Sequence, residues 1–312
     1  AAKGLVEHGL AAALFQAGQG MSGCGRVHET SLLALAFIAQ HSSCLPQLHA
    51  LNASPMAAVV CSQYRRRMKA ISKRSAKSCL DMSLGAIKEK MAAVDKALVL
   101  AVRVLVAAAA LALLSAQTPE QASAVIDSEV VSYLASSLKS FLFKEGILGG
   151  LPPNHRERDP PHATGRSCML LRSIQAGCGE REARKTLRDS ELLEVVVAVA
   201  VMPRTGTQRP DQQMTSAADK EEVDAESARV LAVQLLLCLG EGAGDGGEAG
   251  GAEREALVGS LDALGGEYDS WLWKGSPAIA GEDGLAPDGS DGDSLLAVLR
   301  RGLAVMQAGD TE

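Results

Sequence analysis

The chain has few aromatic residues: Phe, Tyr and Trp together make up 3% of its 312 positions. Because β-sandwiches and β-barrels are usually enriched in aromatic and β-branched residues, this scarcity disfavours both. The apolar fraction of 47% consists mainly of Ala, Leu and Val, and the first two are strong helix formers. No stretch alternates apolar and polar residues as a strand would, and no Asn-Gly pair marks a hairpin. The composition therefore predicts an all-α fold.

Disulfide and export signals are missing as well. The seven cysteines form no CxxC pair, and most lie in apolar runs, where a free thiol behaves as a small hydrophobic group. The first residues read as helix rather than as a signal peptide, so we expect a piece of a longer protein that works in the cytoplasm or the nucleus. Residues 97–114 form an apolar run interrupted by Arg103. We expect a buried core helix there, not a membrane span.

Motifs that carry enzyme chemistry are also absent. The sequence contains no HExxH zinc motif, no GxSxG nucleophile turn and no GxxxxGK[ST] phosphate loop. The glycines at 18–23 spell a dinucleotide fingerprint, but helical text precedes them and no acid follows at the usual distance, so we expect a turn. We predict a protein that is not an enzyme and needs no cofactor or metal. The alternative is an enzyme or small-molecule binder with a pocket near the 152–165 loop, where His155, Arg158 and His162 occur.

Two strings recur with nearly the same period. The string RVL at 103–105 returns at 229–231, an offset of 126, and Arg166 lies at half that distance. The string DSEVV at 127–131 returns as DSELL at 189–193, an offset of 62. A period of this size is typical of stacked helical units, each too small to bury its apolar face alone. The sequence therefore predicts a helical repeat, with the three arginines in equivalent positions at the start of a long inner helix.

The repeating helices resemble the armadillo repeat family. The resemblance is carried by LVEHGLAAAL at 5–14, LLALAFIAQ at 32–40, CLPQLHALNASPMAAVV at 44–60 and RDSELLEVVVAV at 188–199. It implies a right-handed α-solenoid that serves as a scaffold for protein binding. The period exceeds the roughly 42 residues of that family by about 20, so each unit carries a long insertion.

The resemblance implies a single solenoid over residues 1–312. The units are expected at roughly 1–27 (partial), 28–100, 101–165, 166–225 and 226–312. The insertions are expected on one edge of the solenoid, at 61–96, 144–165, 203–222 and 274–293. A flexible section rich in glycine and acids is expected at 240–293, because residues 240–292 hold 15 of the 31 glycines.

The strongest charge feature is a basic run. Seven cations and no acid occur within residues 65–77. Such a run suits a nuclear-import signal, a contact with an acidic partner or an arm tuned by phosphorylation, and a solvated helix is the plain alternative. Because the whole chain has a net charge of −6, we do not expect nucleic-acid binding.

We expect the partners to be other proteins. The section after residue 240 carries 15 acids against four bases, a net charge of −11, which leaves +5 in the first 240 residues. This polarity would orient an elongated partner. The two tryptophans either cap the last unit or anchor a partner. The predicted partner-binding residues are Arg65, Arg66, Arg67, Lys69, Lys73, Arg74, Trp271 and Trp273.

Overall fold

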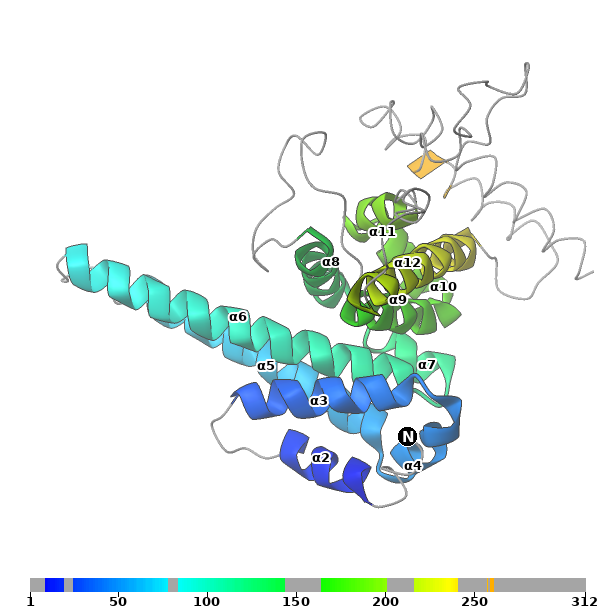
Figure 1. The fold of residues 1–312 in the computed structure, drawn as a ribbon. Helices are drawn as coiled ribbons and strands as arrows, with labels where there is room; N and C mark the ends of the chain where they lie inside the picture. Colours follow the sequence, from blue (N-terminus) through cyan, green and yellow to red (C-terminus); the bar gives the residue numbers. More distant parts are fainter. Residues whose placement is uncertain are drawn as a thin grey trace, which may run out of the picture. The chain divides into compact units, whose positions relative to one another are not determined.

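The protein is helical throughout the part of the chain that its structure, a computed structural model, describes (Figure 1). No strand occurs among these residues, which confirms the all-α prediction. The described residues are 9–19, 25–77, 84–143, 164–200 and 216–240, together with 257, 259 and 260.

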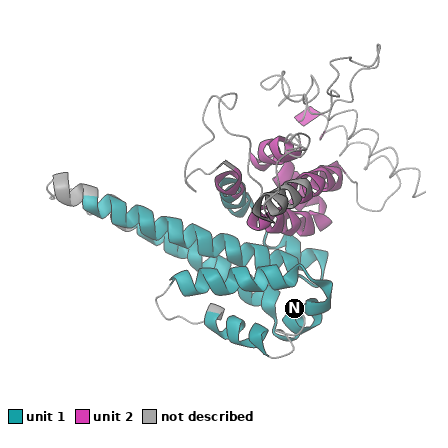
Figure 2. Ribbon diagram, viewed as in Figure 1, with its two compact units in different colours: residues 1–137, 146–149 teal, residues 138–145, 150–312 magenta. Residues whose placement is uncertain are grey.

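The helices cluster into two compact units (Figure 2). Unit 1 comprises Ala1–Ser137 with Gly146–Gly149, and unit 2 comprises Leu138–Glu145 with Gly150–Glu312. The boundary falls within helix α8 (Ser128–Phe143), between Ser137 and Leu138, so each unit contains part of that helix.

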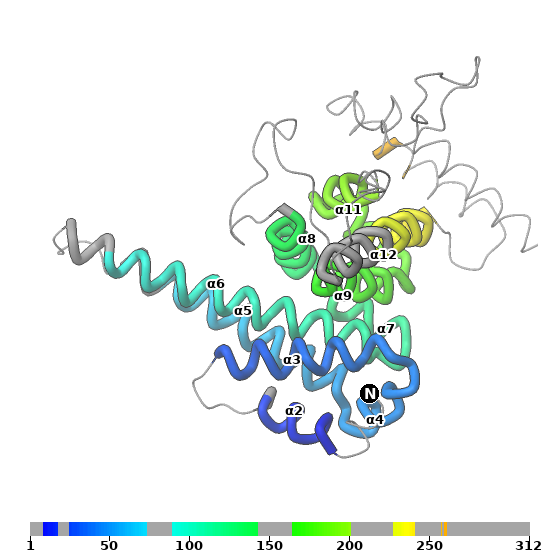
Figure 3. Tube along the Cα trace, viewed as in Figure 1, coloured from blue at the N-terminus to red at the C-terminus, as the bar shows by residue number. Residues whose placement is uncertain are grey.

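Unit 1 is built around a long helical hairpin. Its two arms are α5 (Ala53–Lys77) and α6 (Leu84–Leu114), which pack along each other. Helix α3 (Gly25–Ala39) lies on α6, and α2 (Leu10–Gln19) lies on α3 (Figure 3). The short helices of this unit are the 3-10 turn η1 (Ser42–Cys44), α4 (Leu45–Ala50) and α7 (Pro119–Ser123).

Helix α6 supplies the core of unit 1. Its residues 104–113 are all buried, and Leu105 and Leu111 are fully enclosed. The segment Glu89–Leu114 is long and apolar enough to cross a membrane by length and composition, but 67% of its most apolar window is buried inside the protein. A core helix of a soluble protein passes the same test. The burial agrees with the core helix that the sequence predicts at 97–114.

Unit 2 contains the C-terminal helices. Helices α9 (Gly165–Ala176) and α11 (Leu192–Ala200) both pack against α12 (Ser216–Gly240). Between α9 and α11 the chain forms the 3-10 turn η3 (Gly177–Gly179) and α10 (Arg181–Arg188). Helix α9 begins with a capping box, in which the side chains of Thr164 and Ser167 each accept from the other's backbone N–H.

One expectation about local structure is wrong, and the first insertion takes the helical form that was its plain alternative. Most of the insertion expected at 61–96 is helix, because Tyr64 and Met68 recur at helical spacing among the cations and are buried. Arg166 does lie in the first turn of α9, but Arg103 lies well inside α6 and Arg229 well inside α12. Both helices begin further toward the N-terminus than the short repeat string indicates, α6 at Leu84 and α12 at Ser216.

Candidate functional site

The six predicted binding residues of the basic run all belong to α5. The helix distributes them around its axis, so they do not form a single patch. Arg65 is half-buried, whereas Arg66, Arg67, Lys69 and Lys73 are exposed. The side chain of Arg74 lies outside the described residues, as do Trp271 and Trp273, the histidine loop at 152–163 and nearly all of the glycine-rich section.

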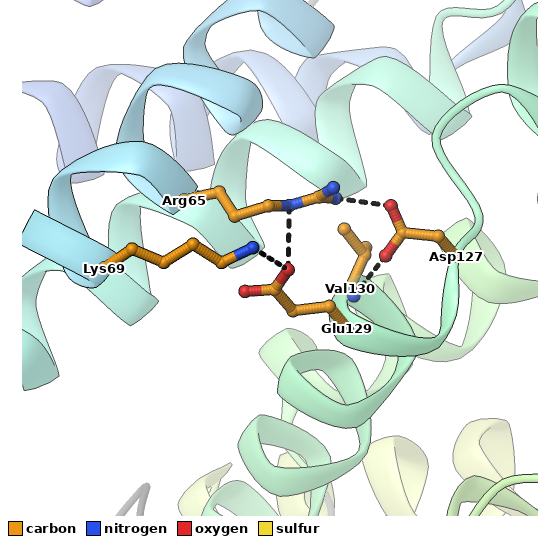
Figure 4. Close-up of polar contacts among 5 residues, drawn as sticks. All are labelled: Arg65, Lys69, Asp127, Glu129 and Val130. Carbon is orange, nitrogen blue, oxygen red and sulfur yellow. Dashed lines mark hydrogen bonds and ion pairs between the residues drawn. The ribbon is translucent and has the colours of Figure 1, made fainter.

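Arg65 and Lys69 bind acids of the same unit (Figure 4). Arg65 Nη2 donates to Asp127 Oδ2 at 2.6 Å, and Arg65 Nε lies 3.6 Å from Glu129 Oε2. Lys69 Nζ donates to the same Glu129 oxygen at 3.0 Å. These two cations bind α5 to the start of α8. We therefore assign Arg65 a structural role ahead of a role in partner binding.

The acid that receives Arg65 also caps a helix. Asp127 Oδ1 accepts the backbone N–H of Val130 at 2.9 Å, which satisfies one of the donors left open at the N-terminus of α8. Both Asp127 and Glu129 therefore stand where the helix dipole favours negative charge. The Asp-Ser-Glu string at 127–129 therefore lies at the start of α8, where basic side chains of α5 bind its two acids.

The second copy of this string receives a basic side chain in unit 2. Lys139 Nζ, on α8, donates to Glu191 Oε2 at 2.8 Å, just before α11 begins. The Lys139 side chain is only 6% exposed, so its ammonium depends on this carboxylate. Ser190 caps α11 by accepting the N–H of Leu192 at 3.2 Å. Each acidic helix start is therefore bound by a base on an earlier helix, α5 for the start of α8 and α8 for the start of α11.

Arg67 belongs to a different contact, with Tyr64 and His28. Nδ1 of His28, on α3, lies 2.8 Å from the Tyr64 hydroxyl, and both residues are buried. The two rings meet edge to face, and the Arg67 guanidinium lies 5.6 Å from the centre of the Tyr64 ring. Burial first, and the Arg67 charge second, lower the pKa of His28. The neutral imidazole therefore joins α3 to α5.

Lowering the pH should weaken the contact between His28 and Tyr64. In the unfolded chain His28 binds a proton below about pH 6.5, whereas in the folded chain its lowered pKa delays protonation to a lower pH. The contribution of neutral His28 to folding stability is therefore complete above about pH 6.5 and is lost as the pH falls toward the lowered pKa. We expect wild type to lose more stability than His28→Gln between pH 7.5 and pH 5. Urea unfolding at both pH values measures the difference. Equal losses in the two proteins would show that His28 is not the group that titrates.

Most of the described cysteines are buried. None of Cys44, Cys61, Cys168, Cys178 and Cys238 forms a disulfide. The pKa of Cys61 is raised to about 11, chiefly by burial, so its thiol is protonated at neutral pH. Among the described residues, no group of three or more His, Cys, Asp or Glu side chains could hold a metal ion.

The remaining cations point away from the hairpin interior. Arg66 and Lys73 are seven residues apart and so share one face of α5, opposite the buried side chains of Tyr64 and Met68. Neither makes an ion pair with any residue that the structure describes. Sequence reasoning identified these cations but did not separate them from Arg65 and Lys69, because only the fold brings Asp127 and Glu129 to that side of the helix.

Comparison with known proteins adds no further assignment. No protein-family model matches the chain, and neither a curated protein nor a solved structure is similar to it.

Proposed function

We propose that the chain is a non-enzymatic scaffold for protein–protein interaction, built as a right-handed armadillo-like α-solenoid with long insertions. The repeated link between a basic side chain and an acidic helix start supports this architecture. Arg65 and Lys69 bind the start of α8, and Lys139 binds the start of α11. The acidic helix starts recur at the 62-residue offset of the repeat, and stacked units place equivalent segments in similar contacts, although the bases that bind them lie at different spacings.

The observation that carries the functional proposal is the outward cation face of α5. Arg66, Arg67 and Lys73 remain exposed after Arg65 and Lys69 have been bound by acids. Exposed cations that no described acid binds attract an acidic partner and orient it, although they supply little affinity by themselves. We therefore assign an acidic protein as the partner of α5. The free cysteines fit a reducing compartment such as the cytoplasm or nucleus.

A protein fits this surface better than a nucleic acid. Glu89 and Asp95 of α6 are exposed on the same hairpin, at the end that carries the cations. These acids would repel a phosphate backbone, whereas a protein can present both signs of charge. The net charge of −6 acts in the same direction.

Removing the outward cations should weaken partner capture. We expect Arg66→Ser/Lys73→Ser to retain less of its partner than wild type at low salt, and the difference to shrink at moderate salt as the charges are screened. Quantitative mass spectrometry of proteins captured by the whole chain measures this. Arg65 is left intact because its loss would also disturb α8.

The matched control removes two exposed cations elsewhere, Arg26→Ser/Lys185→Ser. It has the same net charge as the test variant, so a general charge effect would reduce capture equally in both. Equal capture by wild type and Arg66→Ser/Lys73→Ser at both salt concentrations would contradict the proposal.

A further inference from the structure

The end of the hairpin that bears the cations has a face covered by no other described helix. Figure 1 shows α5 and α6 continuing beyond the N-terminal end of α3. We call residues 65–73 of α5 and 89–97 of α6 the distal arm. Within it, Arg67 on α5 and Ala93, Lys96 and Ala97 on α6 are exposed, whereas Ile71 is partly exposed. These five residues define the distal face.

The distal face continues a surface that already binds a helix. Leu100 of α6 faces α3, since a Cβ added at Gly25 would lie 2.8 Å from Leu100 Cδ2. Ala97, Lys96 and Ala93 are three, four and seven residues before Leu100, so they lie on the same side of α6. On α5, Tyr64 contacts His28 of α3, and Arg67 and Ile71 follow it at the same helical spacing.

The residue types of this face suit a helix as occupant. Alanines at positions 93 and 97 allow a helix backbone to approach closely, as Gly25 already does one turn further along. Arg67 and Lys96 border the alanines, one on each arm of the hairpin. An α-helix presents an apolar stripe with charged borders at the spacing that would match this arrangement.

The charges of the distal arm indicate which charge the partner helix should carry along the edges of its apolar stripe. The described side chains of the distal arm include seven cations, Arg65, Arg66, Arg67, Lys69, Lys73, Lys90 and Lys96. The arm's own acids are Glu89 and Asp95, and Asp127 and Glu129 of the α8 start add two more. Seven cations against four acids give these described side chains a net charge of +3, which favours an acidic partner.

We infer that the distal face docks one amphipathic helix of the partner, with its apolar stripe against Ala93, Ala97 and Ile71 and acidic side chains along its borders. The inference rests on the proposed function and specifies the form of the acidic partner. The docked helix follows the line of α3, so the two-helix arm becomes a three-helix layer, as it already is where α3 covers it.

Peptide binding tests this inference with the whole chain. The probes are a fluorescein-labelled 21-residue peptide with Leu and Ala at heptad core positions and Glu at the flanks, a scrambled peptide of identical composition, and a single-stranded oligonucleotide of equal length. Fluorescence anisotropy at low salt gives each dissociation constant. We expect the amphipathic peptide to bind more tightly than either of the other two probes.

The discriminating variant is Ala93→Arg, matched by Ala70→Arg on the outward face of α5. Both add one cation to an exposed position. If charge alone governs binding, both should bind the acidic peptide at least as tightly as wild type. If a helix docks on the distal face, Ala93→Arg should bind about tenfold more weakly, because the new side chain occupies the contact, and Ala70→Arg should not.

The outcomes separate the inference from the proposed function. Equal binding of the amphipathic and scrambled peptides, or tighter binding by Ala93→Arg, would overturn helix docking and leave an acidic partner in place. Failure of both acidic peptides, together with unchanged capture by Arg66→Ser/Lys73→Ser, would overturn both. Preferential binding of the oligonucleotide would assign the surface to nucleic acid instead.

Discussion

Replacing Arg184 with Met is expected to lower the free energy of unfolding by about 3 kcal/mol, the largest effect that we predict for a single side chain. Arg184 is 3% exposed, and its Nη1 donates to the carbonyl oxygens of Cys178 at 3.0 Å and Gly179 at 3.1 Å. These carbonyls belong to η3, which follows the end of α9. Met fills a similar volume but cannot donate, so the buried Cys178 carbonyl and the partly buried Gly179 carbonyl both lose their charged partner.

Urea unfolding followed by circular dichroism measures this effect. Lys185→Met is the control, because Lys185 is the adjacent residue of α10 and is exposed. Arg184→Lys should fall between wild type and Arg184→Met, since a single ammonium keeps the charge but loses the fork geometry. A loss for Arg184→Met no larger than that for Lys185→Met would show that η3 does not depend on the guanidinium.

Replacing Glu191 with Gln is expected to lower the free energy of unfolding by about 2 kcal/mol, since it leaves the Lys139 ammonium buried without its carboxylate. The Lys139 side chain is 6% exposed and the Glu191 side chain 47% exposed, so solvent screens part of the pair and the loss should stay below that of a fully buried one. The same unfolding measurement gives this loss. Glu182→Gln on the exposed side of α10 is the control.

A second substitution tests whether the loss comes from the buried cation. Lys139→Met removes the charge, and Lys139→Met/Glu191→Gln removes both members of this ion pair, so no buried ammonium remains without its carboxylate. We expect the double variant to recover most of the stability that Glu191→Gln loses. Equal losses in Glu191→Gln and in the double variant would show that the pair does not hold α8 to the start of α11.

The sequence predicts helix class well because the signal is compositional. Runs of Ala, Leu and Val without alternation leave helix as the remaining choice, and the two Asp-Ser-Glu strings lie at helix starts in the structure. The basic residues that bind these strings, Arg65 and Lys139, were not predicted from the sequence. Arg65 lies 62 residues before Asp127, whereas Lys139 lies 52 residues before Glu191, so no constant spacing reveals the two links.

The basic run shows a second reason for incomplete prediction. Its cations suggested an insertion outside the helical units, although Tyr64, Met68 and Ile71 already had the spacing of a buried helix face. Which cations stay exposed depends on Asp127 and Glu129, which only the fold brings to α5. Arg184 carried no sequence signal either, because its acceptors are backbone carbonyls that any residue supplies.

The most direct test of the central claim is amide hydrogen exchange on the whole chain, with and without the captured partner at saturating concentration. Our account predicts slower exchange in residues 65–73 of α5 and 89–97 of α6, where the outward cations and the distal face lie. Exchange in α9 and α12 should not change. Protection confined to α9–α12, with none in the distal arm, would contradict a partner-binding role for α5.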